Sequence, residues 1–502
     1  PSVARDIARV LGCRTRADGY FTGNGYAVTW AFGHLVEIAE PAAMDPSWAK
    51  PWRRQQLPMV PSRWKYEVTK SGKKQFAVIK KLLSVSDTTE IIAATDAGRE
   101  GEHIFRLIYQ LSGSKKPVMR LWVSSLTDEA IREGFRSLKP SQTFDDLAAA
   151  ARARAQADWL MGLNFTCAYT VHNRQLCTVG RVQTPTLALL VNRHHEIEDF
   201  VPQTYYEVHA VLEPGFTAKY IGKDKKIRID DKAFAQQIVD DIAGVSHATA
   251  TSVETKDTRT RPPALFDLLT LQKEANKRFG YTATETLAIA QALYETHKLL
   301  SYPRTESRHL STDMVSNLPA VIDALAGAFP DAAAMAKERF PQQKLPKTYD
   351  DDTKLTDHHA IIPTPKKPSG VSLSEKEQKV YRLVAARFLA IFLRPHVKAE
   401  TVAFFAIGPH TFRATGSVVK YPGWTAIEPT QTEDTEGSTK GRKDEGEEKP
   451  QKLPALEEGE SYPKRSHSLE TRTTKPPKPY NDASLLDAMK KAGAAIDDED
   501  LA

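Results

Sequence analysis

The sequence predicts a multidomain protein of mixed α/β and α+β class. Its 502 residues exceed what one hydrophobic core usually serves. Strands alternate with helices over residues 1–145, an order typical of a mostly parallel sheet. Farther along the chain, apolar and polar residues alternate near 206–262 and 398–428, between helical segments. Such alternation is typical of half-buried strands, so we expect separate helical and β-rich parts.

Local signals predict the first elements. The stretch "PSVARDIARVLG" predicts a helix with Ser2 as its N-cap and Gly12 as its stop. The alternating residues after it predict paired strands, joined by a tight turn at the Asn-Gly pair of residues 24–25. Residues 87–112 predict an apolar strand, an acidic loop with glycines and a helix, and residues 116–135 repeat that order.

Helical patterns dominate the middle of the chain. Residues 146–205 predict long helices. A capping-box pattern from Thr282 to Glu285 begins another helix, which ends shortly before Tyr302. Residues 431–450 are polar, highly charged and free of aromatic residues, which predicts a disordered linker or loop.

Composition narrows the classes of function. Hydrophobic residues make up 41% and charged residues 26%, as in soluble globular proteins. No apolar run approaches the roughly 18 residues of a membrane span, and no export signal opens the chain, so we expect a cytoplasmic protein. Cys13, Cys167 and Cys177 form no C-x-x-C pair, which argues against a disulfide framework or a zinc site. The net charge of +6 favours a polyanionic partner.

The acidic loop "TDAGREGE" offers oxygen ligands. Asp96 follows an apolar strand, and ligands bind at such strand ends in open α/β sheets. Glu100 and Glu102 follow across Gly98 and Gly101, which permit sharp backbone turns. Closely spaced carboxylates could hold Mg²⁺. The alternative is an exposed acidic loop whose carboxylates are favoured by the N-terminus of the next helix.

Tyr302 precedes a proline, with Arg304 two positions farther on. A tyrosine needs a nearby cation or base to favour the phenolate, because its ordinary pKa is about 10. Arg304 is a permanent cation whose planar fork suits phosphate oxygens. One hypothesis is therefore that Tyr302 attacks a phosphodiester while Arg304 stabilises the developing charge. The alternative is a packed aromatic residue in a turn.

The stretch "TDHHAIIPT" places two histidines on a loop before an apolar run. His358 and His359 could donate hydrogen bonds to a phosphate or act as acid and base. Side chains of neighbours in an extended chain point to opposite faces, which argues against metal ligation by both. The alternative is a pair of solvent-facing loop histidines.

Two further stretches carry residues suited to nucleic acid. Arg154 and Asp158 are four residues apart on a predicted helix, where a plain stabilising ion pair is also expected. Arg181 and Gln183 flank a turn whose side chains and amides could meet phosphates and base edges. No P-loop motif occurs in the sequence, which argues against ATP hydrolysis. If the chain cuts nucleic acid and reseals it, the energy of the broken phosphodiester bond must be stored. A covalent phosphotyrosine would store it without ATP.

Taken together and in this order, "TDAGREGE", "ARAQADW", "VGRVQTPTL", "LLSYPRTESR" and "DHHAIIPT" resemble the type IA DNA topoisomerases. The resemblance implies that Tyr302 attacks single-stranded DNA and becomes linked to its 5′ phosphate, assisted by Arg304. It also implies that Asp96 and Glu100 belong to the Mg²⁺-binding loop, with Glu100 also catalytic, and that His358 contacts the scissile region. The positions implied to grip single-stranded DNA are Trp52, Arg154, Asp158, Thr178, Val179, Gly180, Arg181, Val182, Gln183, Thr305 and His359.

The resemblance also implies an architecture. A Toprim-like parallel sheet domain, a helical body, a β-rich arch and a helical tyrosine domain would form a toroid, through which a second strand passes for relaxation and decatenation. The implied boundaries are 1–145 for the Toprim domain, 146–205 for the first part of the body, 206–262 and 398–428 for the arch, 263–397 for the domain carrying the active-site tyrosine, 429–455 for a charged linker or loop, and 456–502 for the second part of the body.

The same resemblance implies Mg²⁺ as cofactor, no ATP, and DNA as partner, chiefly its single-stranded regions. A monomer at the nucleoid is expected, with a helicase or a single-strand-binding protein as candidate partners. The family's first strand usually carries "A-E-K-P-S", whereas this chain begins at Pro1, so we expect a piece that lacks the first strand and the last helices of the body. Two other readings stay open: a Toprim nuclease or primase, and a non-catalytic single-strand-binding protein.

Overall fold

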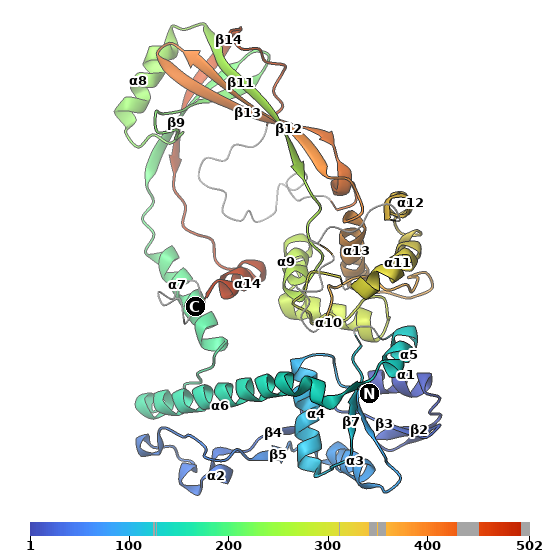
Figure 1. Ribbon diagram of the computed structural model, residues 1–502. Coiled ribbons are helices and arrows are strands. Elements are labelled where there is room, and N and C mark those ends of the chain that lie inside the picture. Colours follow the sequence, from blue (N-terminus) through green and yellow to red (C-terminus); the bar gives the residue numbers. More distant parts are fainter. Residues whose placement is uncertain are drawn as a thin grey trace.

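A computed structural model describes residues 1–123, 126, 128–310, 312–340, 349, 358–428 and 451–492. The chain forms an open ring (Figure 1). A β-barrel closes the ring at the top, and helices descend from it on two sides to an N-terminal domain and a long helix at the base. The expected multidomain toroid of α/β and α+β class is therefore confirmed.

The N-terminal domain begins with a helix and a three-stranded antiparallel meander. Its elements are α1 (Ser2–Val10), β1 (Thr15–Ala17), β2 (Tyr20–Gly23) and β3 (Tyr26–Thr29). The tight turn at residues 24–25 is confirmed, because both residues have positive φ. Ser2 is not the N-cap of α1, however: Pro1 takes that place, and Ser2 is already helical. A serine caps a helix only from a non-helical backbone, so this prediction was wrong.

The rest of this domain contains less parallel sheet than predicted. Its elements are α2 (Pro41–Met44), β4 (Val36–Ile38), β5 (Tyr66–Val68), α3 (Lys73–Ser84), β6 (Ile91–Ala93), α4 (Arg99–Ser112), β7 (Val118–Arg120), α5 (Asp128–Arg136) and β8 (Lys139–Pro140). Among the described strands of the domain, β6 and β7 pair in parallel, whereas the pairs β4–β5 and β7–β8 are antiparallel. The prediction of a mostly parallel sheet was wrong because β1 to β3 return through tight turns instead of helical crossovers.

The predicted long helices of the middle region are α6 (Asp145–Asn173) and α7 (Gln183–Glu198). Helix α6 runs along the base of the ring and packs against α4, while α7 rises toward the barrel (Figure 1). No helix in the described part of the chain is long and apolar enough to cross a membrane.

The barrel has six strands in the order β10-β13-β12-β11-β14-β9. They are β9 (Thr204–Leu212), β10 (Phe216–Tyr220), β11 (His247–Thr260), β12 (His396–Ile407), β13 (His410–Tyr421) and β14 (Ser461–Thr473), with α8 (Lys232–Ala243) packed against them. Alternate side chains face a shared apolar interior that includes Phe216, Phe405 and Phe412. Closing the sheet leaves no free edge on the strands.

Strand β14 corrects the expected domain boundaries. Residues 456–502 were expected in the body, but β14 completes the barrel between β9 and β11. The sequence hides this strand because Tyr462 is its one buried residue. After β14 the chain reaches α14 (Asp482–Lys490), which packs on α7 and α9. Residues 429–450 of the expected linker, and 493–502, lie outside the described residues.

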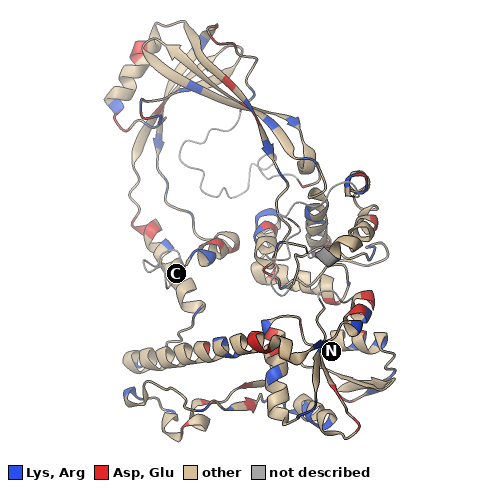
Figure 2. Cartoon of the chain, viewed as in Figure 1, with Lys and Arg blue, Asp and Glu red and all other residues tan. Residues whose placement is uncertain are grey.

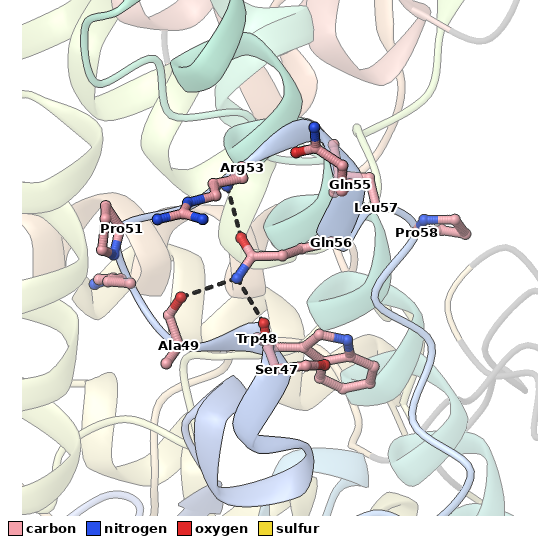
Figure 3. A pocket seen from close by; sticks show the side chains of 10 residues that line it. Ser47, Trp48, Ala49, Pro51, Arg53, Gln55, Gln56, Leu57 and Pro58 are labelled. Atoms are coloured by element: carbon pink, nitrogen blue, oxygen red, sulfur yellow. Dashed lines mark hydrogen bonds between the residues drawn. The ribbon is translucent and has the colours of Figure 1, made fainter.

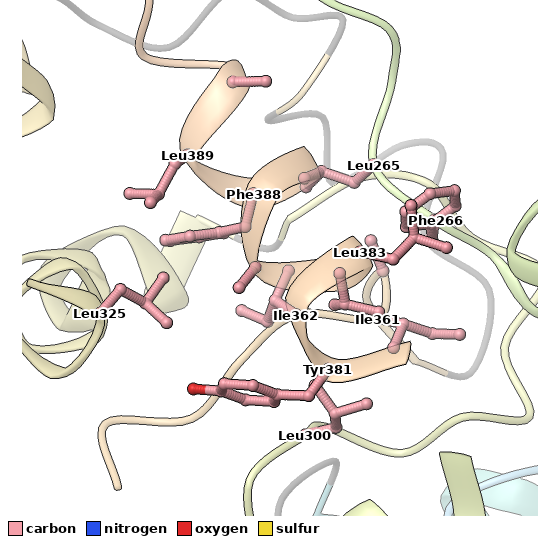
Figure 4. Packing of buried hydrophobic residues seen from close by; sticks show 14 of the residues in the cluster. Leu265, Phe266, Leu300, Leu325, Ile361, Ile362, Tyr381, Leu383, Phe388 and Leu389 are labelled. Atoms are coloured by element: carbon pink, nitrogen blue, oxygen red, sulfur yellow. The ribbon is translucent and has the colours of Figure 1, made fainter. Parts of the chain in front are cut away.

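The domain that carries Tyr302 is helical around one large apolar core (Figure 4). Its helices are α9 (Leu268–Phe279), α10 (Ala283–Glu295), α11 (Leu318–Leu325), α12 (Pro330–Arg339) and α13 (Glu375–Ala390). Thr282 caps α10 as predicted, although the Glu285 side chain binds Lys376 instead of closing the capping box. Figure 4 shows Leu300 and Ile361 packed beside α13, so the core holds two separate loop segments together.

Candidate active site

The loop that carries Tyr302 is fastened to the histidine segment. Ser301 donates its backbone N–H to the Ile362 carbonyl, at 2.9 Å, and its hydroxyl to the Ala360 carbonyl, at 3.1 Å. The Thr364 hydroxyl donates to the Lys298 carbonyl at 2.7 Å. These bonds make the tyrosine loop and the histidine segment one rigid unit, although they lie far apart in sequence.

Thr305 takes part in this fastening. It is buried, and its hydroxyl donates to the carbonyl of His358 at 3.3 Å. Alternate residues of an extended chain face opposite sides, so Arg304, which is exposed, leaves Thr305 on the inner side. Thr305 therefore helps to position the tyrosine loop, and its contact with DNA stays a prediction.

Tyr302 lies between an aromatic cluster and the acidic loop. Its ring centroid is 4.3 Å from that of His358 and 5.4 Å from that of Tyr294. Its hydroxyl donates to Oδ2 of Asp96 at 3.3 Å. Burial and the negative Asp96 raise the pKa of Tyr302 above its ordinary value, while the Arg304 guanidinium acts in the opposite direction. The tyrosine and the acidic loop, predicted from separate motifs, thus meet across two domains.

Both histidines are buried, so the interpretation of solvent-facing loop histidines was wrong. Burial, then the neighbouring His359 and Arg120, lower the pKa of His358 to about 3. His358 is therefore neutral near pH 7, and its Nδ1 has no hydrogen-bond partner in the described part of the chain. Nδ1 of His359 lies 2.7 Å from the Ala360 carbonyl oxygen. The ring of His358 packs at a tilt of 38° against the ring of Tyr302, which places His358 at the reacting centre.

A buried arginine organises the acidic loop. Arg120, at the end of β7, donates to the carbonyls of Ala93, Thr95 and Asp96 at 3.0, 2.7 and 2.6 Å. Its Nε also binds Glu102 at 3.0 Å, and Glu102 binds Arg106 at 2.7 Å. Because Glu102 is fully buried and paired twice, it is not available as a metal ligand.

The two glycines of the acidic loop, Gly98 and Gly101, occupy their positions for different structural reasons. A Cβ on Gly101 would lie 2.1 Å from the Asp96 carbonyl oxygen, so only glycine allows α4 to begin so close to the loop. Gly98 has an extended backbone at its N-cap position, which other residues also adopt. Its significance is that it contributes no third carboxylate beside Asp96 and Glu100.

Asp96 and Glu100 fit a Mg²⁺ site of few protein ligands. Asp96 is exposed on one side, yet the surrounding protein withdraws water from it and raises the pKa of its carboxyl. Glu100 is exposed in the first turn of α4, where Nε2 of His34 lies 2.5 Å from its Oε1. Mg²⁺ commonly takes one or two carboxylates and keeps several waters. The donor set present here is therefore compatible with that ion.

The predicted DNA-gripping residues form a second group, between α6 and α7. Arg181 binds both carboxylate oxygens of Asp158, at 2.5 and 3.3 Å, and lowers the pKa of that carboxyl. The predicted pair between Asp158 and Arg154 was wrong, because the turn from Thr178 to Gln183 returns Arg181 to the same face of α6. Arg154 is exposed and, among the described residues, forms no ion pair.

The turn itself is tied to α6 through Thr166. The Val179 N–H donates to the Thr166 hydroxyl at 2.9 Å, and that hydroxyl donates to the Val179 carbonyl at 3.3 Å. Gly180 donates to the Thr184 hydroxyl at 3.1 Å. Val182 is exposed, so the turn presents both charged and apolar groups to solvent.

Trp52 lies in a loop beside the far end of α6. It lines a hollow of about 520 Å³ together with Thr170 and Arg174, and Lys50 lies 5.0 Å from the centroid of its ring. The same loop encloses a larger hollow of about 770 Å³ (Figure 3). The Gln56 side chain donates hydrogen bonds to the carbonyls of Ser47 and Ala49 there, which stabilises the conformation of the loop.

The geometry of the site defines a class of protein. A ring in which a buried tyrosine meets an acidic Toprim-type loop is the arrangement that the type IA topoisomerase resemblance implies. The family model described as DNA topoisomerase matches residues 142–494, and the Toprim domain model matches residues 1–126. The chain therefore belongs to the type IA DNA topoisomerase family and is an enzyme of the topoisomerase class. The match extends beyond the Toprim domain, so the nuclease and primase readings are not favoured.

Three bacterial proteins illustrate the similarity. The chain is 41% identical to "DNA topoisomerase 3" of Bacillus licheniformis, covering 100% of this chain and 67% of that protein. It is 41% identical to the same-named protein of Shouchella clausii and 40% identical to that of Bacillus subtilis, with the same coverage. The fold is similar to full-length topoisomerase I of Thermotoga maritima, with a TM-score of 0.70, 24% identity, and coverage of 98% of this chain and 74% of that one.

Sequence reasoning missed the residues that support the site. Arg120 and the pairing of Glu102 were not singled out, nor were Tyr294 and Lys298, which lie beside Tyr302 in sequence or space. One signal was present: an arginine within the apolar strand "VMRLW" needs a buried acidic partner. The identity of that partner depends on the crossing of β7 and α4, which the sequence does not display.

Proposed function

We propose that this enzyme cuts one strand of single-stranded DNA with Tyr302, passes a second strand through the break and reseals it without ATP. The single observation that carries the proposal is the hydrogen bond from the Tyr302 hydroxyl to Asp96. It joins a candidate nucleophile on one domain to an acidic loop on another, and separating the two domains would separate the two ends of a cut strand.

The chemical step is a transfer of the phosphoryl group. The phenol oxygen of Tyr302 forms a bond to phosphorus, the bond from phosphorus to the 3′ oxygen breaks, and the released 3′ oxygen takes up a proton. Because the pKa of Tyr302 is raised by burial, the phenol enters the reaction in its neutral form. Its proton leaves as the bond forms, and Asp96 is within reach to accept it. Resealing reverses these steps.

Charged groups on both domains assist the transfer. Arg304 is exposed beside Tyr302 and is suited to hold the phosphate oxygens. Neutral His358 offers a hydrogen bond to the same phosphate. Asp96 and Glu100 would hold Mg²⁺, which supplies positive charge against the DNA backbone when bound. One carboxylate oxygen of Glu100 would bind the ion, while the other would accept a hydrogen bond from His34.

The predicted DNA-gripping residues on and beside α6 would hold the strand to be cut. Arg154 lies on α6, Trp52 lines a hollow with Thr170 of α6, and the turn from Thr178 to Gln183 is tied to Thr166 of the same helix. Helix α6 runs along the base of the ring (Figure 1). Arg181 and Asp158 would form the polar part of that surface, with Trp52 as a platform for a base. Basic residues also lie on the barrel strands and on both sides of the ring (Figure 2), which suits the passage of a second strand.

Relaxation and decatenation are the activities that follow, on single-stranded regions of DNA. We further propose that the enzyme works as a monomer in the cytoplasm at the nucleoid, with a helicase or a single-strand-binding protein supplying suitable DNA.

The decisive comparison is between Tyr302→Phe and Tyr294→Phe. The two phenols are neighbours in the same buried cluster, so both variants lose one hydroxyl from the same place. Each is incubated with Mg²⁺ and negatively supercoiled plasmid, and with a single-stranded oligonucleotide followed by denaturant. We expect Tyr302→Phe to lose relaxation and the 5′-linked adduct, and Tyr294→Phe to retain both.

Relaxation by Tyr302→Phe, or an adduct mapped to another residue, would contradict the proposal. Free DNA ends without an adduct would instead support a nuclease.

A further inference from the structure

Three contacts among the described residues lie at the boundary between the N-terminal domain and the domain that carries Tyr302. One is the hydrogen bond from Tyr302 to Asp96. Another is a small apolar cluster of Tyr302, Tyr294 and Leu126, with Val3 of α1 packed against it. The third is an ion pair in which Nζ of Lys298 lies 2.5 Å from Oδ2 of Asp6. Of these contacts, the hydrogen bond needs the free hydroxyl of Tyr302, whereas the apolar cluster and the ion pair do not.

The ion pair is well placed to be strong. Both side chains are about four-fifths withdrawn from solvent, at 19% and 18% exposure, so the attraction is screened less than at an open surface. Asp6 also pairs with Arg9, at 3.8 Å. Arg9 itself binds Asp128 through two bonds of 2.7 Å, so Lys298 is the closer partner of Asp6.

The backbone of Lys298 is held in an uncommon state. Its φ is +58°, in the left-handed region that non-glycine residues seldom adopt. The Thr364 hydroxyl fixes its carbonyl from the histidine segment. The neighbouring His297 pairs with Glu377 inside its own domain, whereas Lys298 reaches α1 of the other domain. A constrained backbone that directs a charged side chain across the boundary indicates a function at that boundary.

We propose that the Lys298–Asp6 ion pair is a latch that holds the tyrosine domain against the N-terminal domain and positions Tyr302 beside Asp96. This inference rests on the proposed function, because it assigns Lys298 and Asp6 to the step in which the ring opens. Lys298 lies four residues before Tyr302 on the same rigid loop, so closing the latch brings the tyrosine to the acidic loop.

The latch matters most after cleavage. Once the Tyr302 oxygen is bonded to DNA, it has no proton to donate to Asp96, and that contact is lost. The ion pair and the apolar cluster do not depend on the hydroxyl, so they persist and resist opening. Removing the ion pair is expected to increase the open population of the cleaved complex about two- to fivefold, given the strength of partly exposed pairs.

The experiment measures opening and chemistry separately. Fluorophores are attached to cysteines at Glu129 on α5 and Glu338 on α12, which are both exposed and lie on opposite sides of the boundary. Cys177 is changed to serine, since it is the native cysteine that is not buried. The open fraction with bound oligonucleotide is then compared for the parent, Asp6→Asn, Lys298→Met and the double variant. Oligonucleotide cleavage is measured in parallel.

Each single variant should open more than the parent, and the double variant should equal a single one, because both changes break the same pair. The exchange of charges, Asp6→Lys with Lys298→Asp, should restore closing, which a purely structural role would not predict. Lys376→Met is the matched control, since Lys376 pairs with Glu285 within the tyrosine domain. It should leave opening unchanged.

Additive effects of the single variants, or no rescue by the exchange, would overturn the latch. The adduct at Tyr302 should still form in every latch variant, at a rate lowered no more than the population of the closed state is. Failure of the latch with an intact adduct therefore leaves the proposed function standing, whereas absence of the adduct from the parent enzyme would refute that function itself.

Discussion

Glu102 lies 3.0 Å from Arg120, and both side chains are withdrawn from solvent directly beneath the acidic loop. Through Arg120 this pair reaches the carbonyls of Ala93, Thr95 and Asp96. The backbone of the candidate metal loop therefore depends on a buried charge pair. Such supporting bonds typically change metal affinity or activity about 10- to 100-fold when they are removed.

The first prediction is that Glu102→Gln weakens the response to Mg²⁺. Glutamine keeps the shape but leaves the buried guanidinium of Arg120 without its counter-charge, so the loop should rearrange around it. We expect the Mg²⁺ concentration for half-maximal oligonucleotide cleavage to rise about tenfold or more. Glu133→Gln is the control, because its partner Arg136 is exposed. An unchanged midpoint for Glu102→Gln would show that the pair does not support the metal site.

The second prediction concerns the join between the barrel and the tyrosine domain. Glu428 is buried and binds Arg387 of α13 through bonds of 2.5 to 2.9 Å, while Arg387 also lies over the ring of Phe266 at 4.0 Å. Removing one partner of a buried pair costs about 3–5 kcal/mol. Glu428→Gln should therefore destabilise α13 by that amount, measured as faster exchange of its amide hydrogens. Protection equal to that of the parent protein would contradict this role.

Glu285→Gln provides the comparison for that experiment. It breaks a pair with Lys376 that is much more open to solvent and also reaches α13. Little change in protection is expected there.

The helices were the easiest part of the fold to predict from sequence. Thr282 caps α10 as predicted because its hydroxyl accepts from the first turn of the helix, whereas Ser2 already lies inside α1. The site motifs were also local: Asp96, Tyr302 and His358 each stand in a short stretch that matches the family. What the sequence does not contain is which of these stretches meet, since that depends on packing across domains.

Strand β14 and the Asp158–Arg181 pair show the limit more sharply. Strand β14 has a single buried residue, so it lacks the apolar alternation that identifies a strand, and its place is determined by the barrel. Asp158 had a partner of the right charge four residues away, yet it binds Arg181 from a returning turn. Local spacing gives candidates for pairing, and tertiary structure chooses among them.

The third prediction is an acid-dependent loss of barrel stability through Glu207. Burial alone would raise the pKa of Glu207, but the hydrogen bond from His209 and the charges of Lys219 and Arg472 outweigh it and lower the pKa to about 2. A carboxyl with a lowered pKa stabilises the fold above its ordinary pKa of about 4.5, and that stability is lost as the pH falls toward 2.

Glu207→Gln should therefore be less stable than the parent at pH 7 by about 3 kcal/mol, the equivalent of the shift. The difference between the two proteins should shrink as the pH falls from about 4.5 to 2. Thermal unfolding of both proteins over that range measures it. A gap that is independent of pH would mean that the charge of Glu207 is not what stabilises the barrel.

The last prediction concerns His358, whose pKa is lowered to about 3, first by burial and then by His359 and Arg120. A histidine with so low a pKa carries no charge at any pH at which the enzyme is expected to work, so it assists by donating or accepting a hydrogen bond and not through a positive charge. His358→Asn should therefore lower the cleavage rate about 10- to 100-fold, the cost of one to two lost hydrogen bonds at the phosphate. The shape of the rate profile between about pH 6 and 9 should not change.

His410→Asn, which alters a histidine paired with Asp241 on the distant barrel, should leave both the rate and the profile unchanged. If a step near pH 6.5 is present in the parent and absent from His358→Asn, the histidine titrates during the reaction, and binding of DNA must restore its charge.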